Sequence, residues 1–144
     1  MASEGRKLLV PYDGSDAARR ALSFALGRAE GDEGSEVLVL NVQPPIPRGV
    51  SDFVGSKTVK DFQAEEAGKV LAGVARVAGK SKVPVTTDWK TGPASEAIAA
   101  YCRGKGCSEI AMGCRGLGRV SGLLLGSVTT KTLSLVDVPV TLVK

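Results

Sequence analysis

The stretch from Lys7 to Val42, KLLVPYDGSDAARRALSFALGRAEGDEGSEVLVLNV, holds two short apolar runs separated by a longer segment of different period. Lys7–Tyr12 and Glu36–Val42 are rich in Leu and Val, which is typical of strands buried on both faces. Between them Ser15 can cap a helix. The apolar residues of that helix recur at helical spacing: Ala18, Leu22, Ala25, Leu26 and Ala29. This order predicts two parallel strands joined by a crossover helix.

The rest of the chain repeats the alternation of strand and helix. Three further strands are predicted, at Lys82–Trp89, Ser108–Gly113 and Val138–Val143. Pro44, Pro45 and Pro47 predict a loop after the second strand. Helices are predicted along Val59–Val77, from Ala94 to about Arg103 and from Ser127 to about Leu135. Residues 1–144 are therefore predicted to form one α/β domain, a doubly wound, open parallel sheet of five strands with helices on both faces.

Two prolines predict the order of the strands. Pro84 and Pro139 fall inside the third and fifth predicted strands, and proline belongs on the edges of a sheet because it lacks an N–H. The order 3-2-1-4-5, with right-handed crossovers, places both strands at edges. This order reverses between the first and fourth strands, so a crevice is expected at their carboxyl ends.

The composition excludes several classes of function. The chain has no histidine, which rules out a Ser-His-Asp triad, and its three cysteines fit no metal spacing. A formal charge of +4 without a long basic run argues against nucleic-acid binding. No apolar run reaches the ~18 residues that span a bilayer, and no apolar leader opens the sequence. We therefore expect a cytoplasmic protein with no membrane contact.

The stretch Gly113–Thr132, GCRGLGRVSGLLLGSVTTKT, begins at the predicted crevice. Its glycines allow a ligand to approach the backbone amides closely, and Gly126-Ser127 marks a helix start, the positive end of a helix dipole. Arg115 and Arg119 add positive charge. These features predict a polyphosphate site, and a glycine-rich surface loop without a ligand is the alternative. The chain has neither a Walker A loop nor Gly-x-Gly-x-x-Gly after the first strand.

The spacing Gly113-x2-Gly116-x9-Gly126-Ser127 is similar to the nucleotide motif of the universal stress protein family, G-x2-G-x9-G-[S/T]. The segments KLLVPYDGSDAARRAL, VLVLNVQPP, MGCRGLGRVSGLLLGSV and VPVTLVK also resemble that family, so the resemblance covers almost the whole chain. It implies a Rossmann-like domain that binds ATP, or AMP or ADP, with or without Mg²⁺, as a homodimer.

The resemblance also implies roles for individual residues. Asp13 would contact the ribose or adenine, and the adenine pocket would include Pro11, Val42 and Met112. Gly113 would approach the ribose. The remaining implied residues lie along the phosphates: Arg115, Gly116, Gly126, Ser127 and Val128. Ser127 can also cap the last helix, and Asp13 can also cap the first turn.

The chain departs from the family pattern at two positions. Cys114 stands where the family often has Ser or Thr, and Asn41 stands where it often has His. We interpret Cys114 as an inert small residue, although a nearby helix start and Arg115 are conditions that lower a thiol pKa.

The sequence offers little catalytic apparatus, since Asp13 is the one acid predicted at the site. We expect a nucleotide-binding regulatory module of a stress response, acting through an unknown protein partner. A slow ATPase or adenine nucleotide hydrolase is the second interpretation, and a dimeric interaction protein without nucleotide is the third. The edge strand Val138–Val143 is the expected homodimer contact, because pairing across a two-fold axis would cover it.

Overall fold

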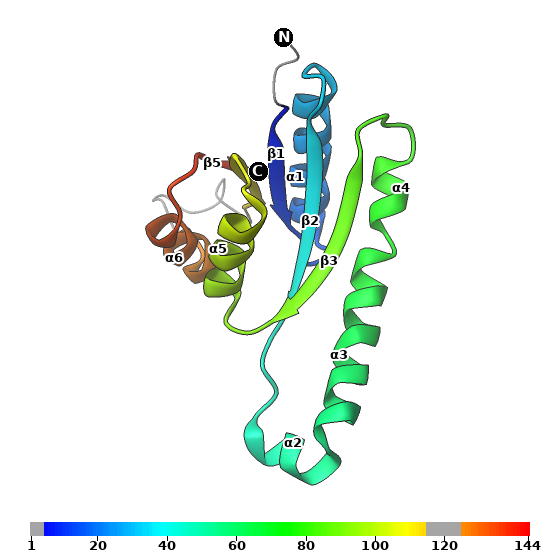
Figure 1. Cartoon of the computed structure of the whole chain (residues 1–144), viewed down its shortest axis with the longest axis vertical. Helices are drawn as coiled ribbons and strands as arrows, with labels where there is room; N and C mark the ends of the chain where they lie inside the picture. The colour runs from blue at the N-terminus through cyan, green and yellow to red at the C-terminus, as the bar shows by residue number, and fades with distance from the viewer. Residues whose placement is uncertain (1–4, 115–124) are drawn as a thin grey trace.

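A computed structural model describes residues 5–114 and 125–144 and contains the predicted five-stranded parallel sheet, in the order β3-β2-β1-β4-β5 (Figure 1). The strands are β1 (Lys7–Pro11), β2 (Glu36–Gln43), β3 (Val85–Thr91), β4 (Glu109–Gly113) and β5 (Val140–Val143). The predicted strand order is therefore confirmed, and the carboxyl ends of β1 and β4 lie side by side at the reversal point.

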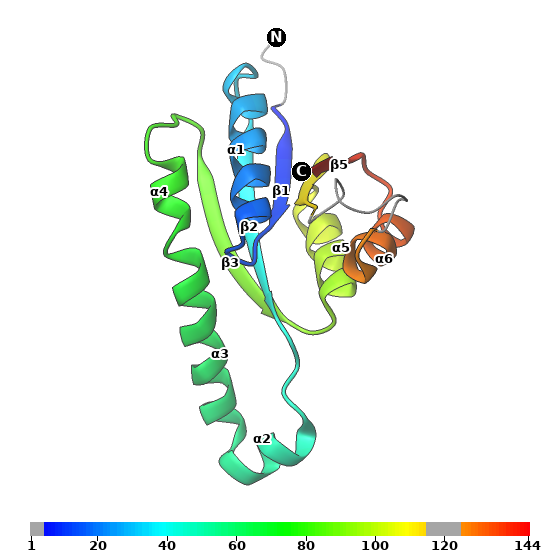
Figure 2. The ribbon, with the colours of Figure 1, turned by 180° about the vertical axis from the view of Figure 1, so that it is seen from behind.

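Helices cover both faces of the sheet. They are α1 (Asp16–Glu30), α2 (Arg48–Val54), α3 (Ser56–Leu71), α4 (Val74–Ala78), α5 (Ala94–Lys105) and α6 (Ser127–Leu135). The helices α1, α3 and α4 pack on one face, and α5 and α6 pack on the other (Figures 1 and 2). No helix within the described ranges is long and apolar enough to cross a membrane.

The core follows the alternation of side chains along each strand. In β1, Leu8 and Val10 face α1, whereas Leu9 faces α5. All three side chains are fully buried. The same alternation continues in β2 and β4, so both faces of the central strands are apolar, as is expected of parallel strands covered by helices.

The strands β3 and β5 are the two edges of the sheet, as the prolines predict. The prolines themselves stand directly before these strands and not inside them. Pro84 and Pro139 directly precede Val85 and Val140, the first residues of β3 and β5. A proline has no N–H for the ladder but keeps its carbonyl. The carbonyls of Pro84 and Pro139 accept backbone hydrogen bonds of 3.0 Å from β2 and β4, respectively.

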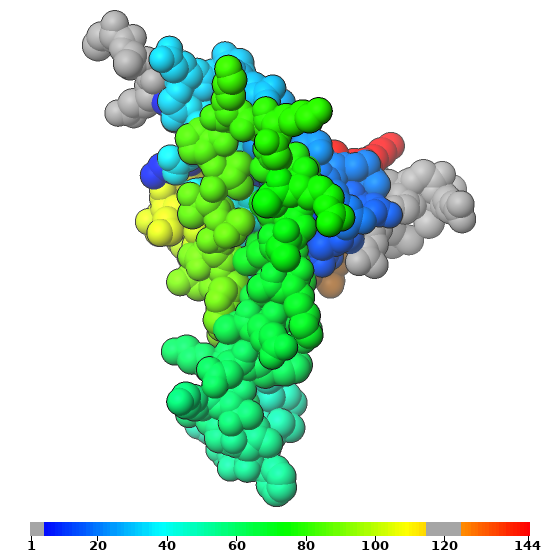
Figure 3. Space-filling view, turned by 90° about the vertical axis from the view of Figure 1, so that its right-hand side faces the viewer, coloured from blue at the N-terminus to red at the C-terminus, as the bar shows by residue number. Residues whose placement is uncertain are grey.

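The prediction of one helix along Val59–Val77 is wrong, because this segment belongs to α3 and α4, and α2 precedes them. The helix α2 starts directly after Pro47, and α3 follows Gly55, whose φ is +91°. Together α2 and the first half of α3 form an arm that projects beyond the strands (Figure 1), and this arm makes one narrow end of the molecule (Figure 3). The side chain of Phe53 on this arm is 90% exposed. Gln63 anchors the arm, since its Nε2 donates to the Pro44 carbonyl at 3.2 Å.

Candidate functional site

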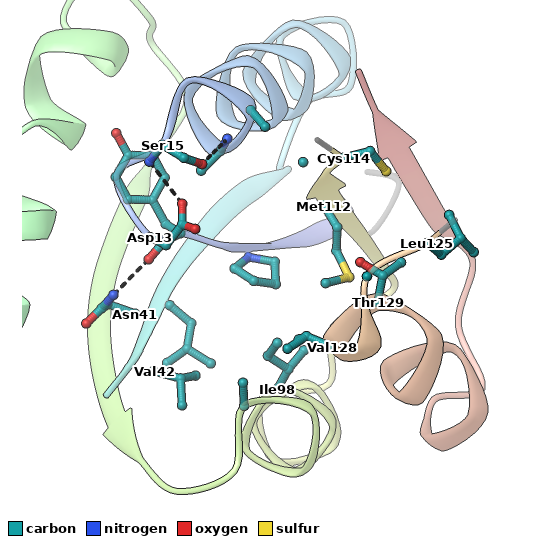
Figure 4. Close-up of a pocket in the computed structure, with 18 residues that line it drawn as sticks. Asp13, Ser15, Asn41, Val42, Ile98, Met112, Cys114, Leu125, Val128 and Thr129 are labelled. Carbon is teal, nitrogen blue, oxygen red and sulfur yellow. Dashed lines mark hydrogen bonds between the residues drawn. The ribbon is translucent and has the colours of Figure 1, made fainter. Parts of the chain in front are cut away.

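A cavity of about 480 Å³ opens at the carboxyl ends of β1 and β4, where the sequence predicts a crevice (Figure 4). This volume is typical of small-molecule sites. The cavity is lined by Pro11, Tyr12, Asp13, Ser15, Ala17, Ala18, Leu40, Asn41, Val42, Ala94, Ile98, Met112, Gly113, Cys114, Leu125, Gly126, Val128 and Thr129. Asp13, Ser15 and Asn41 lie on one side of it, whereas Ile98, Met112 and Val128 make the other side apolar.

A tight turn after β1 positions the acidic residue of the cavity. The Oδ1 atom of Asp13 accepts a 2.9 Å hydrogen bond from the Ser15 amide, and Ser15 Oγ caps α1 by accepting from the Ala18 amide at 3.1 Å. Gly14 has φ +81°, a conformation that glycine adopts without strain. The predicted capping role of Asp13 is thus observed, and its carboxylate also lines the cavity.

A buried asparagine, paired with a half-buried glutamine, fixes the end of β1 against β2. Asn41 is 4% exposed, and its Nδ2 donates to the Tyr12 carbonyl at 2.9 Å. Its Oδ1 accepts a 2.7 Å hydrogen bond from Gln43 Nε2. The Tyr12 amide donates to the Leu40 carbonyl at 2.8 Å. The backbone of Tyr12, directly before Asp13, is therefore held by the backbone of Leu40 and by the side chain of Asn41. Asn41 therefore positions the turn that carries the Asp13 carboxylate.

Gly113 at the end of β4 is required by packing. A Cβ atom at this position would lie 2.5 Å from the carbonyl carbon of Ala17 and 2.6 Å from its oxygen. The first turn of α1 therefore approaches β4 more closely than any residue with a side chain would permit. This glycine has a structural role that does not depend on a ligand, and it also lines the cavity.

The start of α6 lies in the wall of the cavity and has no side-chain cap within the described residues. The N-cap is Gly126, which provides no side-chain hydrogen bond, and the first intrahelical bond is donated by the Thr130 amide to the Gly126 carbonyl. Ser127 is the first residue of the helix, so the prediction that it caps α6 is wrong. With no side-chain cap from the described part of the chain and no acid in its first turn, this helix start is a favourable position for an anion.

Cys114 lies in the cavity wall, 7% exposed. Burial raises the pKa of its thiol, and Lys144 only partly opposes this effect. The residues near Cys114 in the sequence predict a lowered thiol pKa, but the structure gives a raised one. The reason is that desolvation of the thiolate outweighs the attraction of the nearby positive charge of Lys144. An inert small residue remains the better interpretation.

The structure brings most of the predicted site residues together. The predicted residues that line the cavity are Pro11, Asp13, Val42, Met112, Gly113, Gly126 and Val128. Ser127 lies beside the cavity with an exposed side chain and is not part of its lining. Arg115 and Gly116, together with Arg119, lie outside the described residues.

The sequence prediction missed several lining residues. Ala94 and Ile98 come from α5, whose start lies at the same edge of the sheet, and Thr129 lies on the first turn of α6. The position of Ala94 directly after Pro93, at a predicted helix start, was the available signal. Ile98 and Thr129 lie slightly further along their helices, and nothing in their residue types distinguishes them from core residues.

Comparison with known sequences finds similarity along nearly the whole chain. The sequence profile of the universal stress protein family matches residues 5–144. The universal stress protein in the QAH/OAS sulfhydrylase 3′ region of Thermus aquaticus is 32% identical over 142 residues. That alignment covers 96% of this chain and 98% of the Thermus aquaticus protein.

Solved structures share the fold. A universal stress protein in complex with cAMP has a TM-score of 0.73 at 19% identity, over 99% of both chains. A universal stress protein family protein from Arabidopsis thaliana with AMP bound has a TM-score of 0.66 at 19% identity, over 96% of this chain and 91% of the plant chain. These two likenesses establish a common architecture for the sheet and its helices.

Proposed function

The chain belongs to the universal stress protein family, and from this premise we propose that it is a regulatory module that binds an adenine nucleotide, ATP or else AMP or ADP, in the cavity between β1 and β4. The observation that carries the proposal is the uncapped start of α6 in the wall of that cavity. Such a helix start favours phosphate. The two structural neighbours solved with cAMP and AMP support the choice of an adenine nucleotide.

The proposed ligand runs from the apolar side of the cavity to the start of α6. Pro11, Val42 and Met112 contact the adenine base, and Asp13 contacts the ribose. Gly113 lies beside the ribose. The proposed phosphate contacts are Arg115, Gly116, Gly126, Ser127 and Val128, with or without Mg²⁺.

The proposed output is a change in binding to another protein in the cytoplasm, with little or no hydrolysis. The chain has no histidine to act as a general base. Asp13 is the one carboxylate among the described lining residues, and it already accepts a hydrogen bond from the Ser15 amide. A slow ATPase is the alternative, and phosphate release measured over hours distinguishes the two.

We also propose that the protein acts as a homodimer through β5. This strand is an edge of the sheet, and all four of its residues are only half-buried. The amides of Ile110 and Cys114 donate to the carbonyls of Pro139 and Val143, so Leu142 directs its backbone groups toward the free edge. Light scattering after size-exclusion chromatography tests the dimer, and Leu142→Pro is expected to weaken it. A monomeric wild-type protein would contradict this part of the proposal.

Isothermal titration with Mg-ATP and with AMP tests the nucleotide site. In Gly126→Val, the new Cβ meets nothing within 4 Å among the described residues, and Gly126 itself lines the cavity. We expect micromolar-range binding by the wild type and at least about a tenfold loss in this variant, since tenfold corresponds to about 1.4 kcal/mol of lost contact.

The matched control is Gly31→Val. Gly31 follows α1 at the end far from the cavity, and a Cβ there also meets nothing within 4 Å. It should leave the affinity unchanged. If the folded wild type binds neither nucleotide, the proposal is wrong and the interaction-protein alternative takes its place.

A further inference from the structure

A second cavity, of about 380 Å³, lies between α5 and the carboxyl end of the edge strand β3. It is lined by Lys90, Thr91, Ala97, Ala100, Tyr101, Gly104 and Lys105. It shares no lining residue with the first cavity, which uses Ala94 and Ile98 of the same helix. The volume again lies in the range of small-molecule sites.

The inner surface of this cavity is apolar and is left open by the protein. Ala97 and Ala100 have small side chains, and Tyr101 contributes a buried ring. Gly104 lies within α5 and has no positive φ, and a Cβ there would meet nothing within 4 Å. Neither backbone conformation nor packing therefore requires glycine at this position. A side chain at this position would therefore occupy space that is now part of the cavity.

The rim carries two ammonium groups. Lys90 and Lys105 are exposed, and within residues 5–114 and 125–144 neither forms an ion pair. The Nζ atom of Lys105 lies 5.7 Å from the centroid of the Tyr101 ring. The acid that faces this region is Asp88, which interacts with the Tyr101 hydroxyl. The pKa of Tyr101 is raised to about 12, mainly because the hydroxyl is buried and also because Asp88 is close to it.

We propose that this second cavity binds a small carboxylate with a compact apolar body, the carboxylate between the ammonium groups of Lys90 and Lys105 and the apolar body against Ala97, Ala100 and Tyr101. Ammonium groups that form no ion pair within the described residues favour an anion, and the apolar lining favours a ligand with a hydrocarbon portion. Tyr101 remains neutral at physiological pH and keeps its hydroxyl toward Asp88, so it does not repel the anion.

Benzoate is the probe, and it is titrated into ¹⁵N-labelled protein in the absence of nucleotide, so the result does not depend on the proposed function. We expect a dissociation constant of about 1 mM, as is ordinary for a ligand of this size. The amide shifts should be concentrated at Lys90, Thr91 and the last turns of α5. Benzamide has the ring of benzoate without its negative charge, and acetate has the carboxylate without the ring. Each should bind at least about tenfold more weakly than benzoate.

Two pairs of variants test the location. Gly104→Leu fills the cavity and should weaken benzoate binding at least about tenfold, whereas Gly27→Leu, on the exposed side of α1 with equally free space, should leave it unchanged. Lys90→Gln and Lys105→Gln should each weaken binding by about 1.5-fold to fivefold. Proton–nitrogen spectra of each variant verify the fold. Shifts confined to other residues, equal binding of benzamide, or unchanged binding by folded Gly104→Leu would each overturn the proposal.

Discussion

Replacing Gly113 with alanine should destabilise the protein even when no ligand is present. The new Cβ would lie 2.5 Å from the carbonyl carbon of Ala17, 2.6 Å from its oxygen and 2.8 Å from its Cβ, where ordinary contacts begin at 3.4 Å. The first turn of α1 and the end of β4 must therefore separate by about 1 Å. Overpacking of this kind costs about 1–3 kcal/mol. For a domain of this size we expect Tm to fall by about 3–10 °C.

Thermal unfolding followed by circular dichroism measures this effect, with Gly27→Ala as the matched control. Gly27 lies on the exposed side of α1, the same helix, and a Cβ there meets nothing within 4 Å. Alanine in a helix interior is favoured over glycine by about 0.5–1 kcal/mol, so this control should raise Tm by a few degrees. A Tm for Gly113→Ala equal to that of the wild type would refute the close packing of α1 on β4. If the prediction holds, lost nucleotide binding in Gly113→Ala is not by itself proof of a ligand contact.

Three further predictions concern residues in or near the cavity. Burial raises the pKa of the Cys114 thiol, so iodoacetamide at pH 7.5 should alkylate it more slowly than free cysteine, and faster labelling would contradict the burial argument. Lys131 holds the pKa of Glu96 below its ordinary value. The contribution of this ion pair to the stability of the fold is therefore present above the pKa that Glu96 has in the unfolded chain, and it is lost as the pH falls through the pKa of Glu96 in the folded protein. In Lys131→Met the pKa of Glu96, followed by NMR titration, should rise toward its ordinary value; no change would disprove the pairing. Asn41→Ala leaves the Tyr12 carbonyl without its side-chain donor and should lower the free energy of unfolding in urea by about 1–3 kcal/mol, whereas an unchanged urea midpoint would show that Asn41 does not hold this turn.

The strand order could be predicted because proline acts through the backbone. Pro84 and Pro139 cannot donate to a ladder, and this property holds whether a proline lies inside a strand or directly before it. The inference about sheet edges was therefore correct even though both strand boundaries were shifted. The crevice between β1 and β4 followed from the order alone.

The parts that could not be predicted depend on contacts between distant segments. The spacing of apolar residues along Val59–Val77 is helical throughout, and it does not reveal that α3 ends at Leu71 and that Val74 starts a separate short helix on α1. The burial of Cys114 depends on how β4 packs. The structural need for Gly113 likewise comes from Ala17, which is far away in the sequence.

The three helices that start at the cavity differ in how their starts are compensated. In α1, Ser15 caps the helix and Asp16 lies in its first turn. In α5, no side chain caps the helix but Glu96 lies in the first turn. In α6, the cap is Gly126 and no acid lies in the first turn. A carboxylate near a helix start lessens its attraction for another anion.

Of these three starts, α6 therefore offers the strongest attraction to phosphate. This asymmetry favours one direction for the proposed nucleotide, in which its sugar lies toward β1 and its phosphates lie toward α6. The same argument makes a test of direction possible. Val128→Asp places an acid in the first turn of α6, and it should weaken the binding of ATP more than that of adenosine. Equal weakening of both would show that the phosphates lie elsewhere.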